Sequence, residues 1–333
     1  ALKTSSTGVR NISIGHNSME LNQNGSDNVA IGHDALKTGV DTDNNVAIGR
    51  AALGSSTADN NTAVGRSALS ANTSGTGNVA IGQNALDANT TSSGLTAVGQ
   101  GALGASTGAS NTAVGNGASS ANTSGADNVS MGRDSLYYNT TGGSNTAIGR
   151  SAMQGPGSGQ STGSNNTAIG RGALFNNTSA SDNTAVGRSA LTANTSGSGT
   201  AVGAYALDAQ TTGYNNTAIG NNALSTMTTG GRNVAVGRNS MGLATTALYN
   251  TAVGTFSLQN TTTGSSNTAI GYHAMNLNTE GGSLTAVGVN ALYSNTTGLR
   301  NIAIGANALY ASQTANDNLA IGPSALAANT SGT

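Results

Sequence analysis

The sequence predicts an all-β protein built as a parallel β-solenoid, with about 19 coils of 17 residues and two short strands in each coil. Three observations lead to this fold class. A glycine returns at a nearly constant spacing, the residues before it alternate in character, and each repeat closes on a stretch of Asn, Thr, Ser and Gly. One copy of the repeat unit runs from Asn61 to Leu69 and its closing turn ends at Gly75.

The repeat glycine occurs nineteen times, spaced by 17 residues, by 16 in three intervals and by 21 in one. Its positions are Gly15, Gly32, Gly49, Gly65, Gly82, Gly99, Gly115, Gly132, Gly149, Gly170, Gly187, Gly203, Gly220, Gly237, Gly254, Gly271, Gly288, Gly305 and Gly322. A fixed period this short indicates that each repeat is one coil of a solenoid.

The residues before the repeat glycine predict the first strand of each coil. Thr or Val, then Ala or Ser, then Ile or Val give a period of two, which is typical of a strand. The glycine favours a bend before a second short strand, and the closing Asn-Thr-Thr-Gly favours a tight turn. Adjacent coils should then pair in parallel, about 4.8 Å apart.

Stacked coils place equivalent residues in ladders, which we expect at Asn61, Ala63, Val64, Gly65, Ala68 and Leu69 and their counterparts. The exceptions to the pattern are Leu95, Gly199 and Leu284 for Asn, Met131 for Ile or Val, and Ser119 for Leu. One hypothesis places Ile/Val and Leu/Met in the core and turns the Ala/Ser positions toward a neighbouring subunit. The reverse assignment of the Ala/Ser positions stays open at this point.

The unbroken repeat predicts a single β-solenoid region over residues 1–333. The 21-residue interval contains Gly155, Pro156 and Gly157, so we expect a loop insertion near residues 154–162. Both ends of the sequence fall inside a repeat, which suggests a segment of a longer fibre protein or a unit that stacks end to end.

Composition narrows the possible functions. Charged residues make up 8% of the chain, the formal net charge is −1, and there is no cysteine. Nucleic acid is therefore not an expected partner, and no apolar run predicts membrane insertion by this segment. Each coil offers only two large apolar side chains, worth about 2 kcal/mol each, against the entropy of ordering 17 residues. Self-association would supply the missing buried surface.

No catalytic constellation stands out, so we expect no enzyme, no cofactor and no metal site. His16 and His33 share one position in successive coils without a third ligand, which indicates surface ladder residues. Asp34 and Asp134 each follow a basic residue and suggest ion pairs at the rim.

Seven of the twelve Lys and Arg residues lie at the position just after the repeat glycine. Among them Arg133, Arg150, Arg171 and Arg188 are candidate contacts for acidic glycans or lipopolysaccharide phosphates, with solvated rim charge as the favoured alternative. Tyrosines near the turns are candidates for stacking on sugars, although isolated surface residues are the favoured interpretation: Tyr137, Tyr138, Tyr205, Tyr249, Tyr272, Tyr293 and Tyr310.

The string Asn-Thr-Ala-Ile-Gly, found at residues 145–149, 166–170, 216–220 and 267–271, resembles the head repeat of trimeric autotransporter adhesins of the YadA type. The longer form with Ala-Leu and Asn-Thr-Thr-Gly is similar to repeats of phage-type tail fibres that carry a chaperone domain. The resemblance implies a left-handed parallel β-roll, three chains side by side, and a place on a cell or virion surface. The coil of 17 residues is longer than that of the usual adhesin head.

From these observations we predict a non-enzymatic structural rod of an extracellular fibre or filament, an adhesin head or tail fibre used for attachment or assembly. Its expected partners are copies of itself, as a homotrimer or an end-to-end filament, and host or surface glycans. The alternative is a β-solenoid whose Thr and Asn ladders bind ice or a polysaccharide.

Overall fold

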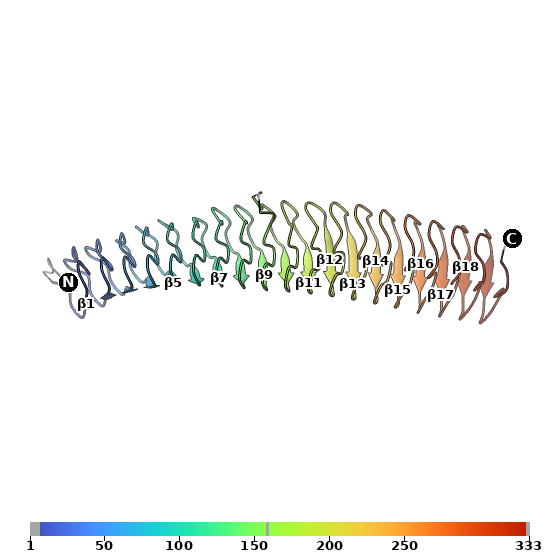
Figure 1. The fold of residues 1–333 in the computed structure, drawn as a ribbon, viewed down its shortest axis with the longest axis horizontal. Coiled ribbons are helices and arrows are strands. Elements are labelled where there is room, and N and C mark those ends of the chain that lie inside the picture. Colours follow the sequence, from blue (N-terminus) through green and yellow to red (C-terminus); the bar gives the residue numbers. More distant parts are fainter. Residues whose placement is uncertain (1–6, 158–159, 331–333) are drawn as a thin grey trace. The chain divides into compact units, whose positions relative to one another are not determined.

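The computed structural model describes residues 7–157 and 160–330, and the chain falls into two compact units, residues 1–166 and 167–333. Within each unit consecutive coils pair through short parallel strands, so the predicted parallel β-solenoid is confirmed (Figure 1). Among the described residues of the first unit the strands are β1 (Ile12–Ile14), β2 (Val29–Ile31), β3 (Val46–Ile48), β4 (Thr62–Val64), β5 (Val79–Ile81), β6 (Thr96–Val98), β7 (Thr112–Val114), β8 (Val129–Met131) and β9 (Thr146–Ile148). Those of the second unit are β10 (Thr167–Ile169), β11 (Thr184–Val186), β12 (Gly199–Val202), β13 (Asn216–Ile219), β14 (Val234–Val236), β15 (Thr251–Val253), β16 (Thr268–Ile270), β17 (Thr285–Val287), β18 (Ile302–Ile304) and β19 (Leu319–Ile321).

The strands pair in the register that the repeat dictates. Ala63 lies opposite Ala80 and Val64 opposite Ile81 in the pairing of β4 with β5. The same register holds across a 16-residue interval, where Val46 pairs with Thr62. The missing residue is therefore absorbed outside the strands, and equivalent side chains stack on one another as predicted.

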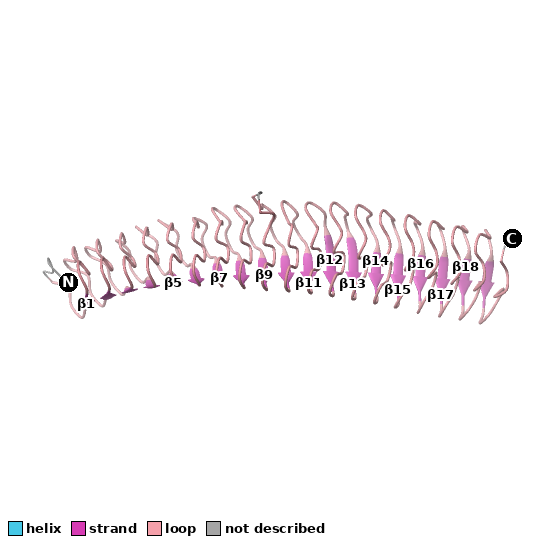
Figure 2. Cartoon of the chain, in the orientation of Figure 1, coloured by secondary structure: helices cyan, strands magenta, loops and turns pink. Residues whose placement is uncertain are grey.

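The second strand expected in each coil does not form, and the described coils contain one strand each (Figure 2). From the repeat glycine onward, every second residue has a positive φ, with 137° at Gly65, 58° at Ser67 and 51° at Leu69. The Ser67 N–H donates to the preceding coil at 2.9 Å, whereas the Leu69 N–H donates to Ala85 of the next coil at 3.0 Å. This segment therefore bonds to both neighbouring coils without the extended backbone of a strand.

The core differs from the first hypothesis. Ala63, Ala68 and Leu69 are fully buried, whereas Val64 is only partly buried and Ile81 is 41% exposed. Placing Ile/Val in the core was wrong, because side chains alternate along a strand and the inward Ala forces both of its neighbours outward. The Ala/Ser positions line the interior of each coil and do not face a neighbouring subunit.

Asparagine at the first position of the repeat forms a buried column. The Asn45 side-chain Oδ1 accepts the N–H of Asn61 at 2.9 Å, and its Nδ2 donates to the Ala58 carbonyl at 3.0 Å. An amide suits this position because it carries one acceptor and one donor without charge. Where Gly199 replaces Asn, strands β12 and β13 each gain a residue and the backbone pairs directly.

The coil register returns after the 21-residue interval within the first unit. Ser161 donates its N–H to the Tyr138 carbonyl at 3.0 Å and accepts that of Thr140 at 2.9 Å. The expected insertion near residues 154–162 thus falls in a long connection, of which residues 158–159 lie outside the described residues.

Across residues 7–157 and 160–330, the structure contains no helix with the length and apolar character required to cross a membrane.

Candidate interaction surfaces

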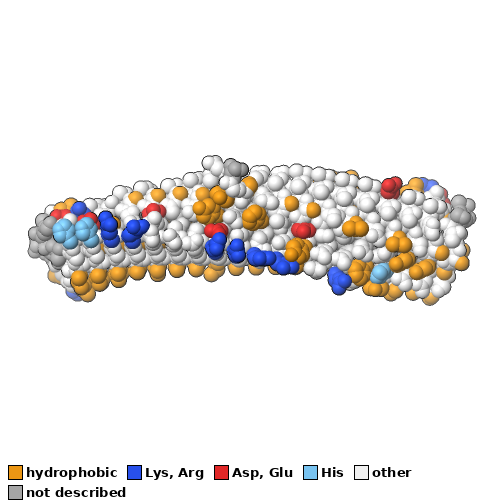
Figure 3. Space-filling model, viewed as in Figure 1, with side chains coloured by type: hydrophobic (Ala, Val, Ile, Leu, Met, Phe, Trp, Pro, Cys, Tyr) orange, Lys and Arg blue, Asp and Glu red, His pale blue; other side chains and the backbone are white. Residues whose placement is uncertain are grey.

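The outward side of the strands carries a column of branched apolar side chains. Ile148 in the first unit is 37% exposed and Ile270 in the second is 41% exposed. A row of hydrophobic side chains follows the strands of the first unit along the lower edge of Figure 3. Beside it runs the Thr/Val column of the same strands, so each unit has a regular, largely uncharged outer sheet face.

We call the Ile/Val/Met column and its Thr/Val neighbour the apolar sheet face. Its Ile/Val/Met members in the first unit are Ile14, Ile31, Ile48, Val64, Ile81, Val98, Val114, Met131 and Ile148. Those in the second unit are Ile169, Val186, Val202, Ile219, Val236, Val253, Ile270, Val287, Ile304 and Ile321. Large exposed apolar patches on folded proteins are found at interaction surfaces, ligand-binding grooves and aggregation-prone sites.

The basic residues that directly follow the repeat glycine lie next to this face, and we call them the basic line: Arg50, Arg66, Arg133, Arg150, Arg171, Arg188 and Arg238. In the first unit Arg133 and Arg150 occupy neighbouring coils, and Arg133 pairs with Asp134 at 2.9 Å as expected. In the second unit Arg188 lies over the Tyr205 ring, with 4.6 Å from Cζ to the centroid. Arg150 and Arg171 are exposed, and no ion pair involves either within the described residues. The predicted contact residues therefore form one neighbouring pair in each unit.

The two histidines at the same repeat position stack on each other, with ring centroids 5.1 Å apart. His33 Nδ1 lies 2.8 Å from an Asp34 carboxylate oxygen, the contact expected from their adjacency. Burial opposes ionisation of Asp34, but its hydrogen bond from Asn17 and the nearby His33 and Lys37 lower its pKa overall. In the described part of the chain no three His, Cys, Asp or Glu side chains lie close enough to hold a metal ion.

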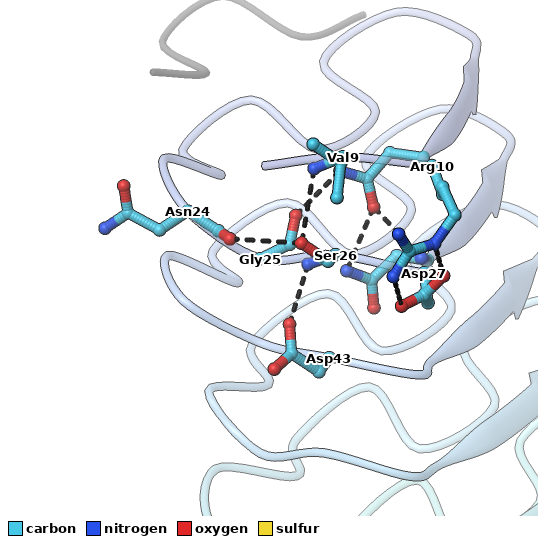
Figure 4. A network of polar contacts seen from close by, with 9 residues as sticks. Val9, Arg10, Asn24, Gly25, Ser26, Asp27 and Asp43 are labelled. Atoms are coloured by element: carbon cyan, nitrogen blue, oxygen red, sulfur yellow. Dashed lines mark hydrogen bonds and ion pairs between the residues drawn. The ribbon is translucent and has the colours of Figure 1, made fainter. Parts of the chain in front are cut away.

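Two arginine–aspartate pairs hold neighbouring coils together at the turn that precedes the buried asparagine. Arg10 and Asp27 make two hydrogen bonds in the first unit, one of them 2.7 Å long (Figure 4). Arg300 and Asp317 repeat this arrangement in the second unit. In each pair the guanidinium hydrogen bond lowers the pKa of the aspartate. Both pairs are exposed to solvent, where ion pairs contribute little to the overall stability of a protein. Their effect is therefore limited to fixing the turn.

A carboxylate also ties coils together without a cationic partner. Asp43 Oδ1 accepts the backbone N–H of Ser26 in the preceding coil at 2.7 Å (Figure 4). Asp59 does the same for the N–H of Asp43 at 2.8 Å. These acidic residues of the first unit are therefore part of the turn structure, which leaves them poorly suited to hold a ligand.

An open polar depression of about 510 Å³ lies in the second unit, beside the coil in which Gly199 replaces asparagine. Its lining consists of hydroxyl, amide and backbone groups and one carboxylate: Ser181, Asp182, Ser198, Gly199, Thr200, Asn215, Asn216 and Thr217. The same interval is one residue short, so a missing side chain and a missing residue coincide here.

Sequence reasoning treated the tyrosines as isolated and overlooked Tyr214. Arg232 lies between the rings of Tyr214 and Tyr249, with its Cζ 5.2 Å from each centroid. A second group forms around His273, whose ring centroid is 4.1 Å from that of Tyr272. The spacing of these residues could have revealed the contacts, because positions about 17 residues apart must stack.

Comparison of the chain with protein-family models and with curated proteins gives no match.

Proposed function

We propose that this chain is a non-enzymatic structural segment of an extracellular fibre, and that its copies associate through the apolar sheet face. The supporting observation is the continuous column of branched side chains on the outer side of the strands, exemplified by Ile81 at 41% exposure. A cell-surface adhesin head or a virion tail fibre is the setting that the repeat resemblance suggests.

The small interior of the coil supports the proposed association. Ala63 and Ala68 bring the two sides of the coil together, so Leu69 is the one large apolar side chain that this coil buries. The second large apolar side chain, Val64, points outward. Burying it against another copy would add about 25 cal/mol for each Å² removed from water. Three copies side by side, as in the trimeric adhesins that the repeat resembles, would enclose this column from every side.

The apolar sheet face is tested by placing a charge on it. Size-exclusion chromatography with light scattering should give three times the chain mass for the unmodified protein. Ile81→Lys should shift the mass toward one chain, because three ammonium groups would meet at the packed centre. Ser74→Lys, on the exposed closing turn of a neighbouring coil, is the matched control and should leave the mass unchanged.

A stable monomer with an intact circular dichroism spectrum at micromolar concentration would remove the proposal. Equal masses for the Ile81→Lys and Ser74→Lys variants would instead place the association elsewhere on the molecule.

The same face supports the alternative of ice binding, because most coils place a Thr or Val beside an Ile or Val there. Thr62 and Val64 of β4, for example, both point away from the buried Ala63. A face packed against other copies cannot also contact ice. Inhibition of ice recrystallisation by a monomeric chain would therefore favour the alternative over the fibre.

A further inference from the structure

Five ring side chains of the second unit form a continuous cluster, which we call the aromatic strip: Phe256, Tyr272, His273, Tyr293 and Tyr310. The centroid of His273 lies 5.0 Å from that of Phe256 and 5.8 Å from that of Tyr293. Tyr293 and Tyr310 stack 5.2 Å apart with their planes within 6°. The strip therefore crosses four consecutive coils without a break.

The repeat explains the alignment of these rings. Phe256 and His273 both follow their repeat glycine by two residues, and Tyr293 and Tyr310 follow theirs by five. Coil stacking brings each pair into register, and the two positions meet between His273 and Tyr293. The fold does not require rings at these positions, because other coils carry Ser, Asn or Gly there.

The strip presents an apolar and hydroxyl-bearing surface with little charge. Tyr272 is 51% exposed and Tyr310 is 39% exposed. The next residue in the Tyr310 column is Ala327, so one face of the Tyr310 ring has no aromatic neighbour. No hydrogen bond within the described residues uses the hydroxyl groups of Tyr272, Tyr293 or Tyr310. Burial lowers the pKa of His273, which leaves the centre of the strip neutral at pH 7.

The surrounding groups limit what can bind here. The backbone N–H groups of His273, Asn290 and Ser294 already donate to neighbouring coils at 3.0 to 3.1 Å, so a peptide cannot add as a strand. Among the described residues, Arg238 is the one cation that stacks on a ring of the strip, over Phe256 at one end, and that is too little charge for a polyanion. Amides of Asn290 and Asn307 lie in the same two coils as Tyr293 and Tyr310, joined by a 3.1 Å hydrogen bond.

We propose that the aromatic strip binds a neutral polysaccharide chain that lies along successive coils. Sugar rings offer C–H faces for the exposed faces of Tyr272 and Tyr310, and hydroxyl groups for the tyrosine edges and the flanking amides. A linear polymer matches the linear arrangement of the rings, since both repeat along one direction. This inference rests on the proposed role as a segment of an extracellular fibre, and it adds a ligand class and a site.

The test uses the full chain in affinity gel electrophoresis with four dissolved polysaccharides: galactomannan, xylan, mixed-linkage β-glucan and, as the anionic comparison, dextran sulfate. We expect the mobility of the unmodified chain to fall with at least one neutral polymer. The double variant Tyr272→Ala/Tyr310→Ala should weaken that binding roughly tenfold, because two exposed stacking surfaces are lost. Tyr205→Ala removes a surface tyrosine outside the strip and should leave binding unchanged.

Each other outcome overturns the assignment. Retardation by dextran sulfate alone would assign binding to the basic line, and equal binding by the double variant would place the glycan site elsewhere. No retardation by any polymer would exclude the strip as a polysaccharide site. Light scattering on the same samples separates this result from the fibre proposal, because a chain that assembles but binds no polymer contradicts only the strip.

Discussion

The two units are built from the same type of coil but carry different surfaces. The first unit contains seven Lys and Arg, nine Asp and Glu, and only two aromatic residues, Tyr137 and Tyr138. The second contains five Lys and Arg, four Asp and Glu, and eight Tyr and Phe. Asp27, Asp43 and Asp59 of the first unit join its coils at the turns, whereas several rings of the second unit stack into clusters.

Inside the coil this difference disappears. The inward Ala is buried to the same degree at Ala47 in the first unit and at Ala269 in the second, and the leucine position is buried at Leu53 and Leu292. Interior positions are restricted because the two sides of the coil almost touch, whereas outward positions other than the apolar sheet face vary from coil to coil. Structure is therefore held by the invariant positions, and any unit-specific binding must come from the variable ones.

The largest expected effect comes from adding a methyl group at the repeat glycine. It tests whether the coil excludes extra atoms equally in both units. A Cβ added at Gly65 would lie 2.5 Å from the carbonyl oxygen of Gly82, and one at Gly254 would meet the Gly271 carbonyl even more closely. Gly65→Ala and Gly254→Ala should each cost more than about 3 kcal/mol, because backbone of the next coil must move. The midpoint of thermal unfolding, followed by far-ultraviolet circular dichroism, measures the effect.

Gly77→Ala and Gly172→Ala are the matched controls in the two units. Both glycines have φ of 66°, but an added Cβ would meet nothing closer than 3.8 Å. These variants should cost only about 1 kcal/mol, from the left-handed conformation alone. If Gly65→Ala destabilised the chain no more than Gly77→Ala, close coil contact would not be what fixes the repeat glycine.

The second prediction concerns a weak point that only the first unit has. At the leucine position the second unit has Leu or Met in every coil, whereas the first has Ser119 in one. The Ser119 hydroxyl donates to Ser130 Oγ at 2.8 Å, so the exceptional serine at the leucine position is satisfied by a serine at the Ala/Ser position. Ser119→Leu combined with Ser130→Ala should raise stability by about 2 kcal/mol, because a leucine replaces two buried hydroxyls.

Each single change is informative beside the double variant. Ser130→Ala alone leaves the Ser119 hydroxyl without this partner and should destabilise the chain. A double variant less stable than the original would show that the first unit has no room for leucine in this coil. Calorimetry measures these changes in stability. If the two units unfold in separate transitions, it assigns the change to the first unit.

The sequence predicted the coil, the register and the ladders, because glycine spacing and period-two alternation report directly on stacking. It did not predict the segment from Ser67 to Leu69, where a left-handed leucine contradicts the usual preference of that residue. Packing and bonds to both neighbouring coils override that preference. The orientation of Val64 also needed the structure, since alternation alone does not say which face is inward. The aromatic strip was missed because its members lie at three different repeat positions.

The smallest predicted effect comes from one carboxylate in each unit at the same repeat position. Asp87 and Asp208 both follow their repeat glycine by five residues, and burial raises the pKa of each. Asp208 Oδ1 is buried without a hydrogen bond, so its ionised form is the less favourable one. Because the pKa is raised in the folded state, the ionised carboxylate destabilises the fold. This destabilisation is complete above the folded-state pKa and absent below the ordinary value of 3.8.

Asp208→Asn should therefore raise the unfolding midpoint at pH 7 and leave it unchanged near pH 3. The gain should stay below about 1 kcal/mol, because this side chain is partly exposed and solvent screens its charge. Asp87→Asn should act in the same direction in the first unit and by less, since no oxygen of Asp87 is among the buried groups without a partner. Asp317→Asn provides the opposite sign, because the pKa of Asp317 is lowered by Arg300 and its stabilising contribution is lost as the pH falls. If Asp208→Asn had the same unfolding midpoint as the original chain at pH 7, the Asp208 carboxylate would be in contact with water. The charged groups that distinguish the two units would then all lie at their surfaces.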